Sequence, residues 1–181
     1  MSQTWNIDPS HSQLEFAVKH MAISTVRGRF RVIAGSVTTD DHSRLTAIDV
    51  TVDTTSIDTT DGNRDGHLKS PDFFDSANHP HATFKSTNVE SLGGNRYRVA
   101  GHLSIRGVVK PVTLDVEAAD PVKDPWGNQR AAAEGSTRIN RKDWGLNWNQ
   151  VLEFGALLVS EDVRISFEVQ AVKAQAAVQA A

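Results

Sequence analysis

The sequence has no cysteine among its 181 residues. This absence excludes disulfides, thiolate metal sites, iron–sulfur clusters and a thiol nucleophile, and it agrees with a reducing compartment. Long apolar runs are missing too, since none approaches the ~20 residues that a membrane-spanning helix needs. The first five residues show neither the basic nor the apolar region of an export signal. We therefore expect no stable membrane insertion and a cytoplasmic location, or a periplasmic one if an export signal has been removed.

The sequence also has little excess of either positive or negative charge. The 19 Lys and Arg residues are scattered along the chain against 22 Asp and Glu, which gives a formal net charge of −3. Nucleic acids and anionic membranes attract proteins through clustered basic side chains. The composition therefore gives no electrostatic case for either partner, and we expect no nucleic-acid binding.

What is present is an alternation of apolar and polar side chains with the period of a half-buried β-strand. Turn residues separate the alternating segments, as at Asp40–Ser43 and Gly93–Asn95. About eight such strands at short, even spacing predict an all-β fold, an eight-stranded antiparallel up-and-down barrel in one domain. The side chains expected to face inward are Leu14, Phe16, Val18, Val26, Gly28, Phe30, Val32, Ile48, Val50, Val52, Phe84, Tyr97, Val99, Gly101, Leu103, Ile105, Val112, Leu114, Val116, Val163, Ile165, Phe167 and Val169.

One segment, residues 60–75, interrupts the strands with a short helical insertion. Asp61 is suited to cap a helix that runs to Lys69, and Ser70-Pro71 ends it because a residue before proline is pushed out of the helical region. The segment joins a charged cluster to the adjacent aromatics Phe73 and Phe74. We expect it to close one end of the barrel.

Three further segments complete the prediction. Residues 120–129 form a Pro/Gly loop, and residues 140–149, rich in tryptophan but without a clean period, form a loop packed over the barrel. The barrel spans residues 1–173, and the Ala/Gln-rich tail, residues 174–181, forms a frayed helix or is disordered.

The predicted interior mixes large with small side chains, for example Phe16 and Phe167 with Gly28 and Gly135. An eight-stranded barrel has room either for its own side chains or for one small ligand. The pattern leaves both a filled core and a ligand cavity open.

Several motifs in this order resemble the YceI family of lipocalin-like proteins that bind polyisoprenoids. The resemblance implies an elongated barrel whose apolar tunnel holds a long isoprenoid tail, with the polar head near its mouth, and it implies a homodimer. The motifs are Trp5–Asp8, His11-Ser12, His20, Gly28–Phe30, Arg64–Leu68, Asp72–Asp75, Pro80, Gly101–Val108 and Ile139–Gly145.

On this basis we expect an isoprenoid tail to contact Phe16, Val18, Phe30, Val50, Val52, Phe73, Phe74, Phe84, Leu103, Ile105, Trp144 and Phe167. The head group, or the mouth, would involve His20, Arg64, Asp65, His67 and Arg141. Two structural alternatives stay open: Arg64 and Asp65 could pin the helix to the barrel, and Arg141 could belong to a salt-bridged loop around Trp144.

Catalytic and metal-binding alternatives have less support. An acid/base pair of Asp65 with His67, joined by His20, would suit a hydrolase or isomerase. The sequence shows no nucleophile elbow, phosphate-binding glycine loop or HExxH motif. His67 and His79-Pro80-His81 lack a third metal ligand. We therefore expect a non-enzymatic protein without a cofactor that binds, transports or stores a polyprenyl phosphate or isoprenoid quinone. The same barrel binding a fatty acid or fatty amide is the alternative.

Overall fold

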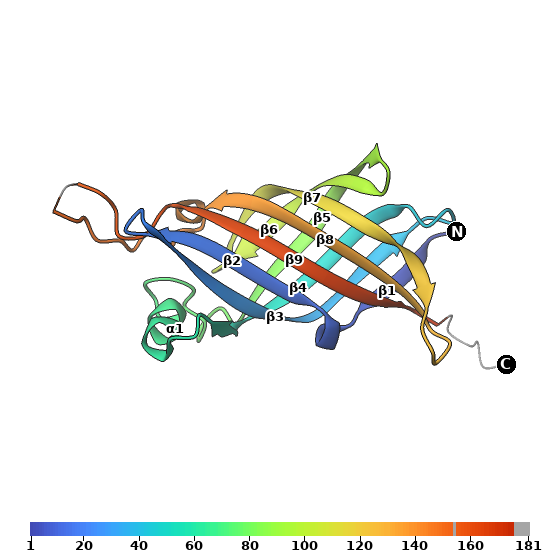
Figure 1. Cartoon of the computed structure of the whole chain (residues 1–181), viewed down its shortest axis with the longest axis horizontal. Helices are drawn as coiled ribbons and strands as arrows, with labels where there is room; N and C mark the ends of the chain where they lie inside the picture. The colour runs from blue at the N-terminus through green and yellow to red at the C-terminus, as the bar shows by residue number, and fades with distance from the viewer. Residues whose placement is uncertain (154, 176–181) are drawn as a thin grey trace.

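The computed structural model describes residues 1–153 and 155–175, which form an elongated antiparallel β-barrel (Figure 1). Within this part of the chain the strands lie in one continuous sheet. The elements, in chain order, are β1 Gln3–Ile7, η1 Pro9–His11, β2 Gln13–His20, β3 Ser24–Thr39, β4 Leu45–Asp58, α1 Gly62–Lys69, β5 His81–Gly93, β6 Arg96–Ile105, β7 Val108–Lys123, β8 Gln129–Asn140, η2 Arg141–Trp144 and β9 Asp162–Lys173. None of the described helices has the length and the apolar character needed to span a bilayer.

The barrel has eight strand positions, as predicted. The strands β2 to β9 pair in sequence order, and the ring closes where β2 pairs with β9. The short strand β1 was not predicted. It pairs with the far ends of β3 and β9, at Gln3↔Thr39 and Trp5↔Lys173. Strands β1 and β2 therefore share one position in the barrel, between β3 and β9.

Local sequence signals placed the insertion and one hairpin correctly. The Asp61 side chain caps α1 by accepting a hydrogen bond from the Arg64 backbone N–H at 3.0 Å, and α1 ends at Lys69. The β5–β6 turn has positive φ at Gly93, Gly94 and Asn95. Such φ values are easiest for glycine and tolerated by asparagine, which is why this turn was predictable.

The loop predicted at residues 120–129 is wrong in its length. Strand β7 continues to Lys123 and β8 begins at Gln129, so the loop spans only residues 124–128. Pro121 lies inside β7, where the register shifts between Ala119 and Val122. A bulge of this kind tolerates a proline because the ladder hydrogen bond is already interrupted there. Of the predicted tail, residues 176–181 lie outside the described residues.

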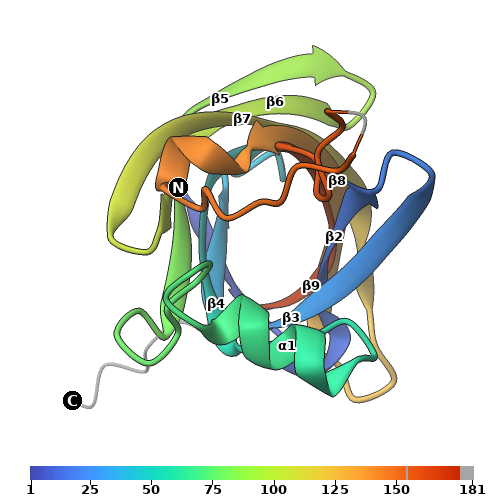
Figure 2. The ribbon, with the colours of Figure 1, turned by 90° about the vertical axis from the view of Figure 1, so that its left-hand side faces the viewer.

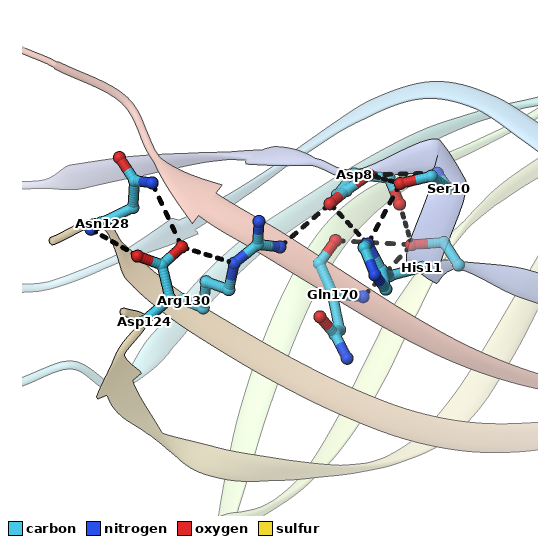
Figure 3. A network of polar contacts seen from close by, with 8 residues as sticks. Asp8, Ser10, His11, Asp124, Asn128, Arg130 and Gln170 are labelled. Carbon is cyan, nitrogen blue, oxygen red and sulfur yellow. Dashed lines mark hydrogen bonds and ion pairs between the residues drawn. The ribbon is translucent and has the colours of Figure 1, made fainter. Parts of the chain in front are cut away.

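The two ends of the barrel differ. Figure 2 looks at the end where α1 crosses one side of the opening and the chain after η2 crosses the other. At the opposite end Trp5 is buried, and its indole N–H donates to the Thr39 hydroxyl at 3.0 Å. Here the Arg130 guanidinium also joins η1 to the β7–β8 loop, since it donates to Asp8 and Asp124 at 2.9 Å each (Figure 3).

Candidate functional site: an apolar cavity along the barrel

A cavity of about 560 Å³ runs along the barrel from Trp5 and Leu45 to His67 and Trp148. Its volume lies within the ~300–1,000 Å³ typical of ligand pockets. The interior predicted from the mixed side-chain sizes is therefore not filled by the protein. The cavity wall contains all twelve residues expected to contact a tail: Phe16, Val18, Phe30, Val50, Val52, Phe73, Phe74, Phe84, Leu103, Ile105, Trp144 and Phe167.

Glycines in the barrel strands let phenylalanine rings approach the backbone closely. Gly28 pairs with Phe16 across β3 and β2, and Gly135 pairs with Phe167 across β8 and β9. A Cβ atom at Gly28 would lie 2.3 Å from Cζ of Phe16, and one at Gly135 would lie 2.4 Å from Cζ of Phe167. These distances are far below ordinary carbon–carbon contact. The rings therefore occupy the space that a side chain would fill, and the centre of the barrel stays open.

Polar lining groups gather at the α1 end of the cavity. His20, Asn63, Arg64, His67 and Arg141 line the wall there. At the Trp5 end the polar side chains that line the cavity include the hydroxyls of Thr39 and Ser43. The lining is thus apolar along most of its length and carries its basic and amide groups at one end.

Three aromatic side chains meet at this α1 end. The imidazole of His67 makes edge-to-face contacts with Trp148 and Phe73, with ring centroids 4.6 and 5.2 Å apart. Its Nε2 atom lies 2.9 Å from an Asp72 carboxylate oxygen, and its side chain is 38% exposed. This cluster fixes the position of α1 relative to the loop that follows η2.

The structure separates Asp65 from the predicted site. Asp65 is absent from the cavity wall, and its carboxylate accepts hydrogen bonds from the backbone N–H and the hydroxyl of Thr59 at 2.9 and 2.5 Å. Arg64 donates to the same residue, to the hydroxyl and the carbonyl, both at 2.8 Å. The geometry matches the alternative in which both charges pin α1 to the barrel, here through Thr59, the residue that follows β4. The pairing of Asp65 with His67 was wrong, because His67 has Asp72 as its partner.

Arg141 reaches the cavity wall but is largely occupied by backbone groups. Its guanidinium donates to the carbonyls of Leu146, Trp148 and Ser160 at 2.5 to 3.0 Å, and to that of Val159 at 3.4 Å. Burial lowers the pKa of this guanidinium, since its charge is taken out of water. The arrangement makes Arg141 the anchor of the loop between η2 and β9.

The surrounding residues show the same structural role. The indole N–H of the buried Trp144 donates to the Leu103 carbonyl at 3.0 Å. Lys142 forms an ion pair with Glu161 at 3.2 Å. These contacts match the salt-bridged loop that the sequence left open as an alternative for this stretch.

Sequence reasoning did not predict which residues of this loop line the cavity. Leu146, Trp148, Leu158 and Val159 all do so. They lie outside regular strands, so no alternation marks them, and their tryptophan content was the one available signal. Among residues 1–153 and 155–175, no group of three or more His, Asp or Glu side chains is placed to hold a metal ion.

A closed antiparallel barrel with an apolar cavity defines this molecule as a member of the small-ligand-binding barrel class. The family model for the YceI-like domain matches residues 5–171. The chain is 37% identical over 138 residues to a UPF0312 protein of Vibrio parahaemolyticus, which covers 76% of this chain and 73% of that protein. It therefore belongs to the YceI family.

Solved structures agree with the fold. BcnA of Burkholderia cenocepacia superposes with a TM-score of 0.75 at 24% identity, covering 91% of this chain and 98% of that one. A polyisoprenoid binding domain from Saccharophagus degradans superposes with a TM-score of 0.65 at 18% identity, covering 94% and 98%. At these identities the likeness concerns the fold alone.

Proposed function

We propose that this protein binds a polyisoprenoid lipid, a polyprenyl phosphate or an isoprenoid quinone, in the barrel cavity and carries or stores it without catalysis. The observation that carries the proposal is the cavity itself, which is apolar along the barrel and has its basic and amide groups at one end. This polarity suits an amphiphile with one long tail and one polar head. Membership in the YceI family supports the proposal. The polyisoprenoid binding domain of Saccharophagus degradans has the same fold, so the fold is compatible with this ligand class.

The polarity of the lining supports one direction of binding. The tail would lie toward Trp5 and Leu45, against side chains that offer dispersion contacts and few polar groups. The head would lie at the α1 end, near His20 and His67. Arg141 would contribute less than an exposed arginine, because four backbone carbonyls already accept its N–H groups.

Such a cavity can discriminate between lipids by the length of their tails. About 25 buried methylenes at ~0.8 kcal/mol each already reach the ~18–21 kcal/mol at which non-covalent affinity saturates. Total apolar area therefore does not distinguish one long tail from another. The length and shape of the lumen decide which tail can be fully enclosed, and so they select the lipid.

The test is mass spectrometry of an organic extract of the purified protein, together with native mass spectrometry of the intact complex. We expect one long-chain isoprenoid per barrel. Phe30→Trp and Leu103→Trp should each lower lipid content, because both side chains face the lumen. Ile33→Trp, at an exposed position on the same strand as Phe30, is the matched control and should leave it unchanged.

The outcomes separate the alternatives. Short acyl lipids in place of isoprenoids would favour the fatty-acid ligand. A stable, folded and empty protein would contradict the proposal, as would full lipid content in the Phe30→Trp and Leu103→Trp variants.

A further inference from the structure

Exposed apolar side chains gather in two loops beside the α1 end of the cavity. Ile23 and Met21 in the β2–β3 turn are 81% and 42% exposed, and Val151 and Leu157 in the loop before β9 are 72% and 39% exposed. Single exposed apolar residues are ordinary on protein surfaces, whereas a group of them at one place indicates an interaction site. We name residues 21–23, 150–153 and 155–158 the mouth loops.

The mouth loops form one connected structure. The Met21 backbone N–H donates to the Leu158 carbonyl at 2.8 Å, and His20 pairs with Val159 in an isolated bridge. Val151 and Leu157 face each other in a second bridge. Figure 1 shows the loop before β9 projecting beyond the barrel, beside the β2–β3 turn. The four exposed apolar side chains therefore belong to one projecting surface.

The β2–β3 turn has a composition that its backbone does not favour. Met21 and Ala22 have φ values of 53° and 58°. Such positions favour glycine, asparagine or aspartate, because other side chains are crowded in the left-handed region. Apolar residues stand at these positions despite that cost, which points to a use for their side chains outside the fold.

The mouth loops are continuous with the cavity wall. Leu158 in these loops and the flanking residues His20 and Val159 line the cavity, next to residues whose side chains face solvent. The exposed apolar surface is thus continuous with the wall through which a ligand would enter. A partner that covers the mouth loops would lie directly against the opening.

We infer that the mouth loops dock the barrel onto a lipid bilayer, with Met21, Ile23, Val151 and Leu157 entering the interfacial region. This inference rests on the proposed function, since a polyisoprenoid must be taken from and returned to a membrane. Lys19 and Arg27 are exposed on β2 and β3 just behind the turn, where they would meet anionic head groups. Glu153 is the one acidic side chain within the described mouth loops. Docking here depends on apolar side chains, so the even spread of charge in the sequence does not oppose it.

The experiment is flotation of the full chain with vesicles of phosphatidylcholine, with and without phosphatidylglycerol. The wild type should float with both and more strongly with the anionic lipid. Ile23→Asp and Val151→Asp should each lower the partition coefficient about tenfold, because each removes one inserting apolar side chain and adds a charge. Lys19→Gln should lower only the gain that phosphatidylglycerol gives.

Val122→Asp is the matched control. Val122 is 63% exposed and lies on β7 near the Trp5 end of the barrel, so its replacement should leave flotation unchanged. Loss of flotation in Val122→Asp equal to that in Val151→Asp would overturn the inference, as would a wild type that floats with neither vesicle. If the mouth-loop variants change the sedimentation coefficient and leave vesicle binding intact, the surface joins copies of the chain and the inference fails.

Lipid extraction separates this inference from the proposed function. Each variant is extracted and analysed by mass spectrometry beside the flotation assay. Site-specific flotation of a protein that carries no isoprenoid supports docking and refutes the proposed ligand. An isoprenoid-loaded protein that does not float refutes docking and leaves the proposed ligand in place.

Discussion

Replacing Gly28 by alanine should destabilise the protein and narrow the cavity. The added Cβ would lie 2.3 Å from Cζ of Phe16 and 2.9 Å from Cγ2 of Thr59. Carbon atoms in contact prefer about 3.5–4.0 Å, so the Phe16 ring must retreat by at least about 1.2 Å. The wall lies behind the glycine, so the ring moves toward the lumen.

The magnitude follows from two opposing terms. Overpacking of this kind costs about 1–3 kcal/mol, while the loss of glycine's backbone freedom in the unfolded chain returns about 0.5–1 kcal/mol. We expect the free energy of unfolding, measured by urea denaturation, to fall by about 1–2 kcal/mol. Bound lipid, measured by extraction, should fall with it.

Two comparisons make the assay decisive. Gly66→Ala is the same substitution in α1, where a Cβ would meet no atom within 4 Å, so it should raise the free energy of unfolding by about 1 kcal/mol. In a Phe16→Leu background, Gly28→Ala should lose most of its cost, which a double-mutant cycle would report as coupling. The idea that the absence of a Cβ at Gly28 leaves room for the Phe16 ring would be refuted by a neutral or stabilising Gly28→Ala. An equal loss of stability in the wild-type and Phe16→Leu backgrounds would also refute it.

Three further predictions concern the loop anchor, the mouth and the Trp5 end. Arg141→Lys should lower the free energy of unfolding in urea by about 2–3 kcal/mol, because a single ammonium cannot donate to all the carbonyls that accept from the guanidinium. An unchanged free energy of unfolding would contradict the anchor role. Trp148→Ala should speed lipid transfer to vesicles several-fold and cost about 1–3 kcal/mol of stability, since it removes the aromatic contacts with His67 and Phe73 at the opening. A transfer rate equal to the wild type's would count against this role. Burial raises the pKa of Asp124, but hydrogen bonds from Arg130 and Asn128 outweigh it and lower the pKa to about 2. Because this pKa is lower in the folded than in the unfolded state, the carboxylate stabilises the fold above the unfolded-state pKa near 4, and that stability is lost as pH falls toward 2. The free energy of unfolding, measured in urea over this pH range, should therefore fall more steeply in the wild type than in Arg130→Gln. Equal slopes would refute the assignment.

The fold was predictable where its signals are local. Alternation marks strands because successive side chains point to opposite faces, and it identified the inward sides of β2, β3 and β4 correctly. The cap at Asp61 and the turn at Gly93–Asn95 depend on a few adjacent residues, so they could be recognised without the rest of the chain. The strand position that β1 and β2 share could not be predicted from local residues, because it is decided by partners on β3 and β9 that lie far away in the sequence.

The site was predictable to a similar degree and for the same reason. Nine of the twelve apolar residues lie on strands, where periodicity already placed them inward, whereas Phe73 and Phe74 follow α1 and Trp144 lies in η2. The partners of the charged residues could not be predicted, since Asp65 and His67 are two positions apart but bond to Thr59 and Asp72. The sequence left open whether Arg141 contacts a head group or belongs to a structural loop, and only the folded loop shows which carbonyls surround it.

The closure of the barrel also sets when a ligand can enter. Strand β9, the last strand of the barrel, completes the ring by pairing with both β1 and β2. While the chain is being synthesised from its N-terminus, the first strands lack this neighbour and no lumen exists. The barrel can therefore enclose a ligand only after β9 has been added, and before that step a lipid would meet the face of an open sheet.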